Sequence, residues 1–431
     1  MSLSTQPYKG ARDFFPEDKR LQKCLFSKLR QTVESFGYEE YDAPILEPLD
    51  IYLAKSGEEI VNEQTYNFTD RGGREVVIRP EMTPTVSRMV AARRQELGYP
   101  LRWYSIPNLW RYERPQRGRL REHWQLNVDL FGVANTAAEL EMITVVDSIY
   151  KNFGATADMY TIQLNSRQLI DYVLNDYLHL EPAQSQAVGK LIDRMHKVTP
   201  ELFTEKINAV LTAEQQAAGV ADKLSAVLTS QSLDDLPAAI LDQPAALELA
   251  DMLSTLWTAG ITNVRYDATL MRGFDYYTGM VFEVTDSHPD NNRSMMGGGR
   301  YDGLVGLFGV EPVPTIGFGL GDATLANFLE LHDLLPTVAV ETDIYIVTAG
   351  EVESTKLQAL AARLRSAGRN VAVDISGRKL GDQFKTADKK GLTRCLVIGN
   401  NELSSGTYNL KDLQTGDSVA VSEAELLELV R

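Results

Sequence analysis

The chain is poor in cysteine and in long apolar stretches. Cys24 and Cys395 are the only cysteines in 431 residues, and they lack the spacing of metal ligands. Two isolated cysteines are typical of reduced thiols in a cytoplasmic protein, which is the expected location. No run approaches the roughly 20 apolar residues that cross a bilayer, so no membrane partner is expected. The N-terminal segment has charges where a signal peptide is apolar, which argues against export.

Positive charge is also scarce overall, because the formal net charge is −16. A polyanion repels nucleic acid on average, which argues against indiscriminate binding to nucleic acid. Two basic patches nevertheless occur, one of six arginines between Arg102 and Arg121 and one of six cations between Ser376 and Arg394. Each patch is either a solvated surface or a focused contact with RNA.

The spacing of apolar residues predicts an α+β catalytic domain. A helix is predicted over 18–36, a strand over 75–79, and a helix starting near Thr83 or Pro84. Two further strands are predicted on either side of an arginine-rich loop around Pro115–Gly118. Strands joined by loops rather than by regular βα repeats favour an antiparallel sheet flanked by helices.

The chain is too long for one core, and its pattern changes along its length. We expect a catalytic domain over 1–332 that contains a helical insertion at about 166–258. Residues 333–341 are the predicted linker. The strand–helix alternation over 342–431 predicts a small α/β domain with a mostly parallel sheet. Within the catalytic domain, 295–309 is expected to be a glycine-rich turn region.

The most informative segment is RGFDYYTGMVFE, which runs from Arg272 to Glu283. Its Arg-Gly opening predicts a tight turn beside a cation, and MVFE reads as a buried strand. The segment therefore places a guanidinium, a carboxylate and the phenols of Tyr276 and Tyr277 at the mouth of a sheet. Such a group suits a small polar substrate, although core packing is the simpler role for the tyrosines alone.

A second group of polar residues surrounds RYERPQRGRLREHWQL. Arg111 at a strand end can hold a phosphate, and Glu113 can accept a hydrogen bond from an exocyclic amine. Alternation along the next strand places Gln125, Asn127 and Asp129 on one face. Without further context, ion pairs on a surface hairpin would explain these charges equally well.

Both segments closely resemble those of the histidyl-tRNA synthetases, a family of class II aminoacyl-tRNA synthetases. The resemblance implies that Arg111 holds the α-phosphate of ATP, that Glu113 contacts adenine and that His123 stacks on it. It also implies that Arg272 acts near the carboxylate and α-phosphate during adenylate formation. Fixed cations suit that step, because it brings two anions together and builds charge on phosphate oxygens.

The resemblance also implies a histidine subsite. In RPEMTP, Glu81 and Thr83 would bind the α-ammonium group, although Thr83 alone reads as a helix cap. The other residues implied around the substrate histidine are Gln125, Asp129, Tyr276, Tyr277 and Tyr301. A pocket with paired polar groups can reject amino acids that lack the matching partners, by as much as ~10⁴-fold.

Three positions depart from the family pattern. Asp129 stands where family members commonly carry Glu, and Met82 stands where many have a small residue. In GFGLGDATLANFL, Thr324 stands where the family has an arginine that contacts the γ-phosphate. Either Arg119 or Arg300, together with Mg²⁺, covers the γ-phosphate, or this chain handles ATP poorly.

The implied activity is formation of histidyl-adenylate from histidine and ATP with Mg²⁺, followed by transfer to tRNA(His). The C-terminal segment resembles an anticodon-binding domain, and the arginines of the 114–121 loop would meet the acceptor stem. YDAPILEP resembles motif 1, which implies a homodimer. Two alternatives stay open: a catalytically inactive regulatory subunit of ATP phosphoribosyltransferase, favoured by Thr324, and a sister synthetase for threonine, proline or glycine.

Overall fold

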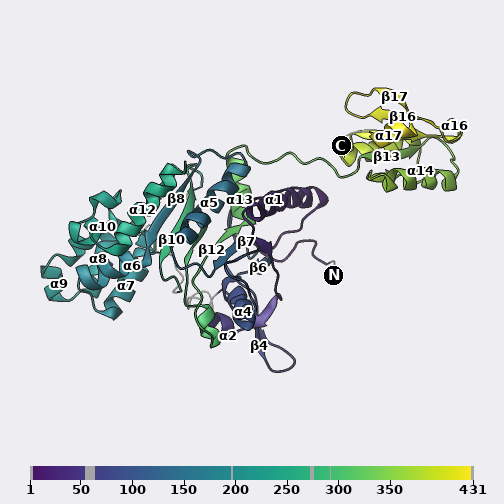
Figure 1. Cartoon of the computed structure of the whole chain (residues 1–431). Coiled ribbons are helices and arrows are strands. Elements are labelled where there is room, and N and C mark those ends of the chain that lie inside the picture. Colours follow the sequence, from purple (N-terminus) through teal and green to yellow (C-terminus); the bar gives the residue numbers. More distant parts are fainter. Residues whose placement is uncertain (1–2, 54–63, 196–197, 272–275, 292, 429–431) are drawn as a thin grey trace. The chain divides into compact units, whose positions relative to one another are not determined.

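The computed structural model of the chain describes residues 3–53, 64–195, 198–271, 276–291 and 293–428. The chain divides into two compact units, one of Met1–Asp13 and Leu25–Leu335 and one of Phe14–Cys24 and Pro336–Arg431. Each of the two units contains a sheet (Figure 1). Helix α1 (Pro16–Ser35) confirms the helix predicted over 18–36.

The larger unit is built on a nine-stranded sheet with the order β1-β5-β7-β12-β11-β10-β8-β9, and β6 pairs with β7 beside this path. The central pairs are antiparallel, as predicted, whereas β1–β5 and β8–β9 at the two edges are parallel. The sheet is therefore mixed. Its strands are β1 (Glu39–Glu40), β5 (Leu101–Ser105), β6 (Asn108–Trp110), β7 (Glu122–Phe131), β8 (Tyr160–Ser166), β9 (Val264–Tyr266), β10 (Met280–Asp286), β11 (Ser294–Arg300) and β12 (Thr315–Gly321).

Strand β11 corrects the prediction of a glycine-rich turn over 295–309, which is wrong for its first half. A Cβ on Gly298 would lie 2.7 Å from the Cβ of Phe318, and one on Gly299 would lie 2.8 Å from the Tyr277 ring. The nearest atoms are backbone oxygens, since the same Cβ atoms would collide with the Gly317 carbonyl and lie 2.5 Å from the Met280 carbonyl. The glycines thus leave room for the backbone and side chains of neighbouring segments over the middle of the sheet. The sequence shows the glycines but not these neighbours, and so it favours a turn.

Helices α5 (Ala137–Asn152) and α13 (Asp322–Leu331) pack against this sheet (Figure 1). On α5, Met142, Val146 and Ile149 recur at three- and four-residue spacing and are fully buried. This spacing places one apolar face of the helix against the strands. Among the described residues, none of the helices has the length and apolarity needed to cross a membrane.

A second, three-stranded sheet of the larger unit leads into the candidate site. Its antiparallel strands have the order β2-β4-β3. They are β2 (Leu46–Pro48), β3 (Tyr66–Thr69) and β4 (Glu75–Ile78), and α2 (Asp50–Leu53) follows β2. Strand β4 and helix α4 (Thr83–Arg93) confirm the strand and the helix start predicted on either side of RPEMTP.

The segment between β8 and β9 consists of helices and turns. This is where the sequence predicts a helical insertion, whose limits as a domain remain a prediction. Its elements are α6 (Arg167–Tyr172), the π-helix η1 (Val173–Tyr177), α7 (Pro182–Ile192), α8 (Pro200–Val210), α9 (Ala213–Ala217), α10 (Val220–Leu228), the 3₁₀ turn η3 (Leu233–Asp235), α11 (Ala238–Leu241) and α12 (Pro244–Thr258). A further 3₁₀ turn, η4 (Val305–Phe308), lies after β11.

The smaller unit carries a five-stranded sheet with the order β14-β13-β15-β16-β17. The first three strands are parallel and the last two are antiparallel, so the predicted mostly parallel sheet ends in a hairpin. Its elements are β13 (Ile344–Thr348), α14 (Ser354–Ser366), β14 (Val371–Val373), α15 (Leu380–Lys389), β15 (Arg394–Ile398), α16 (Asn400–Ser405), β16 (Thr407–Asp412), β17 (Ser418–Ser422) and α17 (Glu423–Glu428).

Candidate active site

The floor of the candidate site is the pair of strands β7 and β12. A Cβ on Gly319 would collide with the amide of Gln125, and one on Gly317 would collide with the carboxylate of Asp129. The two polar side chains therefore occupy space that the glycines of the neighbouring strand leave open. Asn127 lies on the same face, since its Oδ1 would be 3.5 Å from the Gly319 Cβ. The predicted shared face is confirmed.

Asp129 is the most buried carboxylate of this floor. Tyr301 Oη donates a hydrogen bond to its Oδ1, whereas its buried Oδ2 has no hydrogen-bond partner. Burial raises the pKa of Asp129 to about 7, and the hydrogen bond from Tyr301 opposes that rise. The carboxyl can therefore change its charge near neutral pH, and one of its oxygens is available to a ligand.

The predicted tyrosines form one wall beside Asp129. Tyr276, Tyr277 and Tyr301 belong to one buried cluster, and the Tyr276 ring lies 5.5 Å from the Tyr301 ring, edge to face. Tyr276 Oη donates to Glu81 Oε2 at 3.5 Å. The structure thus brings Glu81 and the three tyrosines, which come from distant parts of the chain, to one place.

Thr83 does not cap helix α4. Met82 occupies the N-cap position, and no side chain there accepts a hydrogen bond from the first turn. The Thr83 carbonyl instead accepts from Ser87 Oγ at 2.8 Å. The cap interpretation of Thr83 is therefore wrong. The backbone already turns helical at Met82, one residue before the threonine.

The cationic end of the site begins where β6 ends. Arg111 Nε donates to the carbonyl of Pro80 at 2.8 Å, which ties this arginine to the turn that carries Glu81. Glu113 forms an ion pair with Arg119 across the hairpin loop, and its other oxygen, Oε1, is buried without a partner. The structure therefore brings together Arg111, Glu113 and Arg119.

His123 lies on β7 between the cationic end and Gln125. Its Nδ1 atom is buried and has no hydrogen-bond partner. Burial, and then the positive charges of Arg111, Arg12 and Arg119, lower the pKa of His123 to about 3. The ring is consequently neutral at physiological pH and can act as a flat stacking surface or as a hydrogen-bonding group.

Four buried polar atoms without a protein partner thus lie along one hairpin: Glu113 Oε1, His123 Nδ1, Gln125 Oε1 and Asp129 Oδ2. Leaving such a group unpaired in a folded protein costs about 1–3 kcal/mol. Buried polar groups are nearly always satisfied, so a row of exceptions in one place indicates a polar ligand. The row extends from the cationic end to the tyrosine wall.

Two positions considered for the γ-phosphate serve the protein instead. Arg300 is buried, and its guanidinium donates to both carboxylate oxygens of Glu139 at 2.5 and 2.7 Å and to two backbone carbonyls. It is not available to a nucleotide, so it is ruled out as a phosphate ligand. Thr324 Oγ1 donates to the carbonyls of Gly321 and Met295 at 2.8 and 3.0 Å. Arg119 remains a candidate, and Arg272 lies outside the described residues.

The sequence gives no sign that an N-terminal segment holds the site together. The carbonyl of Gly10 accepts from the amide of Arg121 at 2.9 Å. Arg12 Nη2 donates to Asp322 Oδ2 at 2.7 Å, and the other oxygen of Asp322 accepts from the amide of Trp124. The segment thereby joins the start of β7 to the start of α13.

Tyr41 is another residue that the sequence does not single out. Burial raises the pKa of its hydroxyl well above the usual value, and the nearby charge of Asp129 adds to this rise. Tyr41 therefore lies close to the carboxylate of Asp129. Its place in YDAPILEP suggests a role in subunit contact, and nothing in the local sequence indicates its proximity to β7.

Among the residues that the structure describes, no group of three or more His, Cys, Asp or Glu side chains could hold a metal ion.

The profile described as histidyl-tRNA synthetase matches residues 10–325, and the profile of the anticodon-binding domain matches residues 343–431. The chain belongs to the histidyl-tRNA synthetase family. A histidine–tRNA ligase of Leptospira biflexa is 44% identical over 430 residues, which cover 100% of this chain and 98% of that protein.

Solved structures of the histidyl-tRNA synthetase family have the same fold. The histidyl-tRNA synthetase of Nostoc sp. PCC 7120 superposes with a TM-score of 0.80 at 23% identity and covers 99% of both chains. A protein from Bacillus halodurans, described as an ATP phosphoribosyltransferase regulatory subunit/histidyl-tRNA synthetase, superposes with a TM-score of 0.73 at 22% identity. It covers 92% of this chain and 100% of that one. The fold is that of the class II synthetases, with an anticodon-binding domain.

Proposed function

We propose that the chain is a histidine–tRNA ligase. It would form histidyl-adenylate from histidine and ATP, release diphosphate, and transfer the histidyl group to tRNA(His) with release of AMP. The observation that carries this proposal is the row of four unpaired buried atoms from Glu113 to Asp129. A nucleotide and an amino acid, placed end to end, would supply hydrogen-bond partners to Glu113 Oε1, Gln125 Oε1 and Asp129 Oδ2, and a base on which the His123 ring can stack.

The row divides into two subsites. Glu113 and His123, with the cations Arg111 and Arg119, form the end suited to ATP. Glu113 Oε1 would accept from the adenine amine, and the neutral His123 ring would stack on the base. Arg111, fixed by the Pro80 carbonyl, would face the α-phosphate.

The histidine subsite is the other end of the row. Asp129 Oδ2 would accept a hydrogen bond from the imidazole, Gln125 would contact the substrate beside it, and the tyrosine wall would enclose the ring. Glu81 and Thr83 would bind the α-ammonium group. Asp129 is shorter than the glutamate common in the family. Its Oδ1 atom accepts from Tyr301, and this hydrogen bond fixes the orientation of the carboxylate.

The chemical step needs no general base. The histidine carboxylate is ionised near neutral pH and attacks the α-phosphate directly. Arg111, with Arg272 as expected from the family pattern, would spread positive charge over the phosphate oxygens. We assign Mg²⁺ to the MgATP substrate, because magnesium commonly binds through phosphate oxygens with one or two carboxylates.

The anticodon of the tRNA would bind to the smaller unit, over 342–431. Residues 333–341 would be the linker from the catalytic domain 1–332. Helix α15 and the residues around it carry a cluster of cations suited to single-stranded RNA. These are Arg378, Lys379, Lys385, Lys389 and Lys390. The arginines of the 114–121 loop would contact the acceptor stem.

A homodimer is the proposed assembly. Ile45 and Leu46 at the start of β2, and Phe68 on β3, are about half exposed although they are large apolar residues. Ile45 and Leu46 lie in YDAPILEP, the segment that resembles motif 1, and Phe68 lies on the other edge strand of the same three-stranded sheet. A cytoplasmic location is proposed from the family and from the two reduced cysteines.

The regulatory-subunit alternative is less supported. Thr324 favours it, but the anticodon-binding profile covers the smaller unit and the relatives matched over the full chain are described as ligases. The test is aminoacylation of a tRNA(His) transcript by purified protein with histidine and MgATP. Histidyl-tRNA formation supports the proposal, whereas adenylate formation without charging, or neither, would contradict it.

A further inference from the structure

The buried side chain of Asn165 connects three parts of the larger unit. It stands near the end of β8, and its Nδ2 donates to the carbonyls of Leu270 and Ala268 at 3.1 and 3.4 Å. Its Oδ1 accepts from the amide of Ser166 at 2.8 Å. Ser166 in turn is the N-cap of α6, the first helix after β8.

The turn that Asn165 holds is ordered by a second side chain as well. Asp267 Oδ1 accepts from the amide and the hydroxyl of Thr269 at 2.8 and 2.7 Å, and Gln163 Nε2 donates to Asp267 Oδ2. Two residues of β8, Gln163 and Asn165, therefore hold the turn 267–270 from one side. Residues with the same strand parity share one face, so they reach the turn together.

This turn touches the tyrosine wall of the candidate histidine subsite. Leu270, whose carbonyl Asn165 holds, lies in the same buried cluster as Tyr276, Tyr277 and Tyr301. Tyr301 donates to Asp129. A displacement of Leu270 would therefore shift the rings of the three tyrosines, since close-packed side chains transmit strain to one another.

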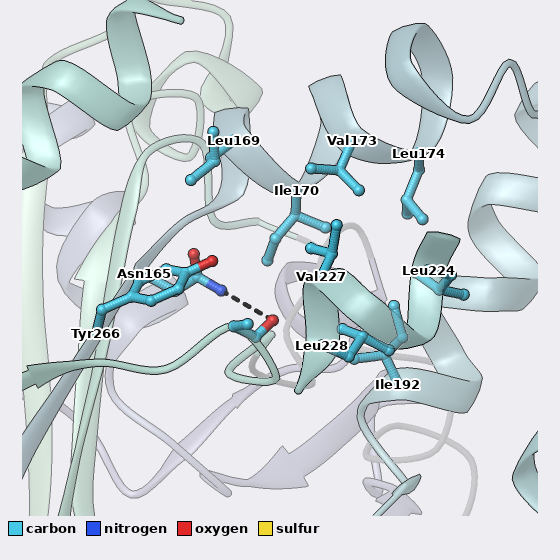
Figure 2. Close-up of a pocket in the computed structure, with 11 residues that line it drawn as sticks. Asn165, Leu169, Ile170, Val173, Leu174, Ile192, Leu224, Val227, Leu228 and Tyr266 are labelled. Carbon is cyan, nitrogen blue, oxygen red and sulfur yellow. Dashed lines mark hydrogen bonds between the residues drawn. The ribbon is translucent and has the colours of Figure 1, made fainter. Parts of the chain in front are cut away.

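The surroundings of Asn165 give its amide few other partners. It lines a small cavity of about 20 Å³ between the turn and the helices that follow β8 (Figure 2). The other side chains in the lining are apolar except for Tyr266. If the Asn165 amide rotated away from the two carbonyls, its N–H groups would face apolar side chains and the carbonyls would lose their donor. The hydrogen-bonded conformation of Asn165 is therefore strongly favoured.

We propose that Asn165 is a positioning residue for histidine: by holding the carbonyls of Ala268 and Leu270, it fixes the tyrosine wall of the amino-acid subsite. The inference rests on the proposed function, because it concerns the pocket for the substrate histidine. Asn165 would not touch the substrate. It would act through Leu270, and ATP, at the other end of the row, would not sense its loss.

The test compares Asn165→Ala with a matched variant, Asn263→Ala, in the full chain. Asn263 is also buried, and its Nδ2 donates to the carbonyl of Tyr160 at 3.0 Å, at the opposite end of β8. Both variants lose a buried amide–carbonyl bond, so both are expected to lower the melting temperature. Asn165→Asp, which keeps the acceptor for Ser166, replaces Asn165→Ala if the latter does not fold.

Two readouts separate positioning from stability. In ATP–pyrophosphate exchange, Asn165→Ala should raise the KM for histidine roughly fivefold or more, which is about 1 kcal/mol, and leave the KM for ATP within about twofold. Asn263→Ala should leave both constants within about twofold. The Leu270 amide donates to the carbonyl of Asp267 at 3.2 Å, which closes the turn that Asn165 holds. Independently of activity, hydrogen exchange of this amide should be faster only in the Asn165 variant.

An unchanged KM for histidine in Asn165→Ala, an equal rise of the KM for histidine and the KM for ATP, or a comparable rise of the histidine KM in Asn263→Ala would overturn the inference. An unchanged exchange rate of the Leu270 amide would show that Asn165 does not hold the turn 267–270. If the proposed function is wrong, the unsubstituted protein would show no histidine-dependent pyrophosphate exchange. Hydrogen exchange of the Leu270 amide would still show whether Asn165 holds the turn 267–270.

Discussion

Gly317 lies directly opposite Asp129 in the antiparallel pair of β12 and β7, and a side chain at Gly317 would overlap the carboxylate. Because Gly317 has no Cβ, the space above β12 is open to the carboxylate of Asp129 on the neighbouring strand β7. Because the space is enclosed, the carboxylate is deprived of water, and its pKa rises to about 7. Burial of the Asp129 carboxylate lowers the stability of the protein without substrate. Because water is excluded, the same burial strengthens a hydrogen bond between the carboxylate and a ligand.

Replacing Asp129 with Asn should separate stability from histidine recognition. The shape is kept, and Asn Oδ1 can still accept from Tyr301, but the buried charge disappears. We expect kcat/KM for histidine to fall roughly tenfold to hundredfold, since a charge-assisted hydrogen bond contributes about 1.5–3 kcal/mol. Pyrophosphate exchange measures this loss.

The same variant should be more stable than the parent at pH 8. Asp129 has a folded-state pKa of about 7 against 3.8 for an ordinary Asp, so the folded protein binds its proton more tightly. This contribution to stability is fully present below pH 3.8 and is lost as the pH rises through 7. Urea unfolding at pH 5 and 8 should therefore show the gain from Asp129→Asn growing with pH, to at most about 4 kcal/mol.

A matched control for this experiment is Asp147→Asn. Asp147 is also buried, but it pairs with Lys151 and accepts from Tyr160 Oη. Removing a charge that has partners should destabilise the protein at pH 8. A gain in stability from both substitutions would show that the effect at Asp129 is not specific to an unpaired carboxylate.

His123 should act through its ring and not through its charge. His123→Phe is expected to keep the KM for ATP within about twofold, whereas His123→Ala should raise it roughly fivefold, because it loses a stacking contact of about 1 kcal/mol. Because the pKa of His123 is lowered to about 3, its ring does not titrate between pH 6 and 8. An ATP KM that depends on pH in the parent but not in His123→Phe would contradict this assignment.

Thr324 should support the backbone and not the nucleotide. Thr324→Val removes the single hydroxyl proton that the carbonyls of Gly321 and Met295 share and is expected to cost about 1–2 kcal/mol in unfolding free energy. The KM for ATP should stay within about twofold, because the hydroxyl points at carbonyls of its own chain. A large rise in the ATP KM without a loss of stability would instead place Thr324 at the phosphates.

Arg300 should be a structural residue. Arg300→Met leaves the buried carboxylate of Glu139 without its partner and is expected to destabilise the protein by about 3–5 kcal/mol. The double variant Arg300→Met/Glu139→Leu should recover much of this loss, since both charges then leave the interior. Thermal unfolding measures both. A single variant that keeps its melting temperature but loses ATP binding would restore Arg300 as a phosphate ligand.

The sequence predicts those parts of the site whose residues are neighbours along one strand. Gln125, Asn127 and Asp129 share a face because strands alternate, and the structure confirms this. The start of α4 and the arginine-rich loop between two strands are likewise local features. Local patterns cannot show which distant residues meet.

The failures have the same physical origin. The glycines of β11 read as a turn because their function, to admit Phe318 and Tyr277, depends on other segments. Tyr41 and Arg12 lie near the site through tertiary contacts that no spacing reveals. Arg300 looks available in the sequence because Glu139, its partner, is 161 residues away.

The most direct test of the account is ATP–pyrophosphate exchange by purified protein with MgATP and each of the twenty amino acids in turn. The account predicts exchange with histidine alone, because the unpaired Oδ2 atom of Asp129 and the tyrosine wall would suit an imidazole. Exchange with another amino acid, or none with any amino acid from folded protein, would contradict it.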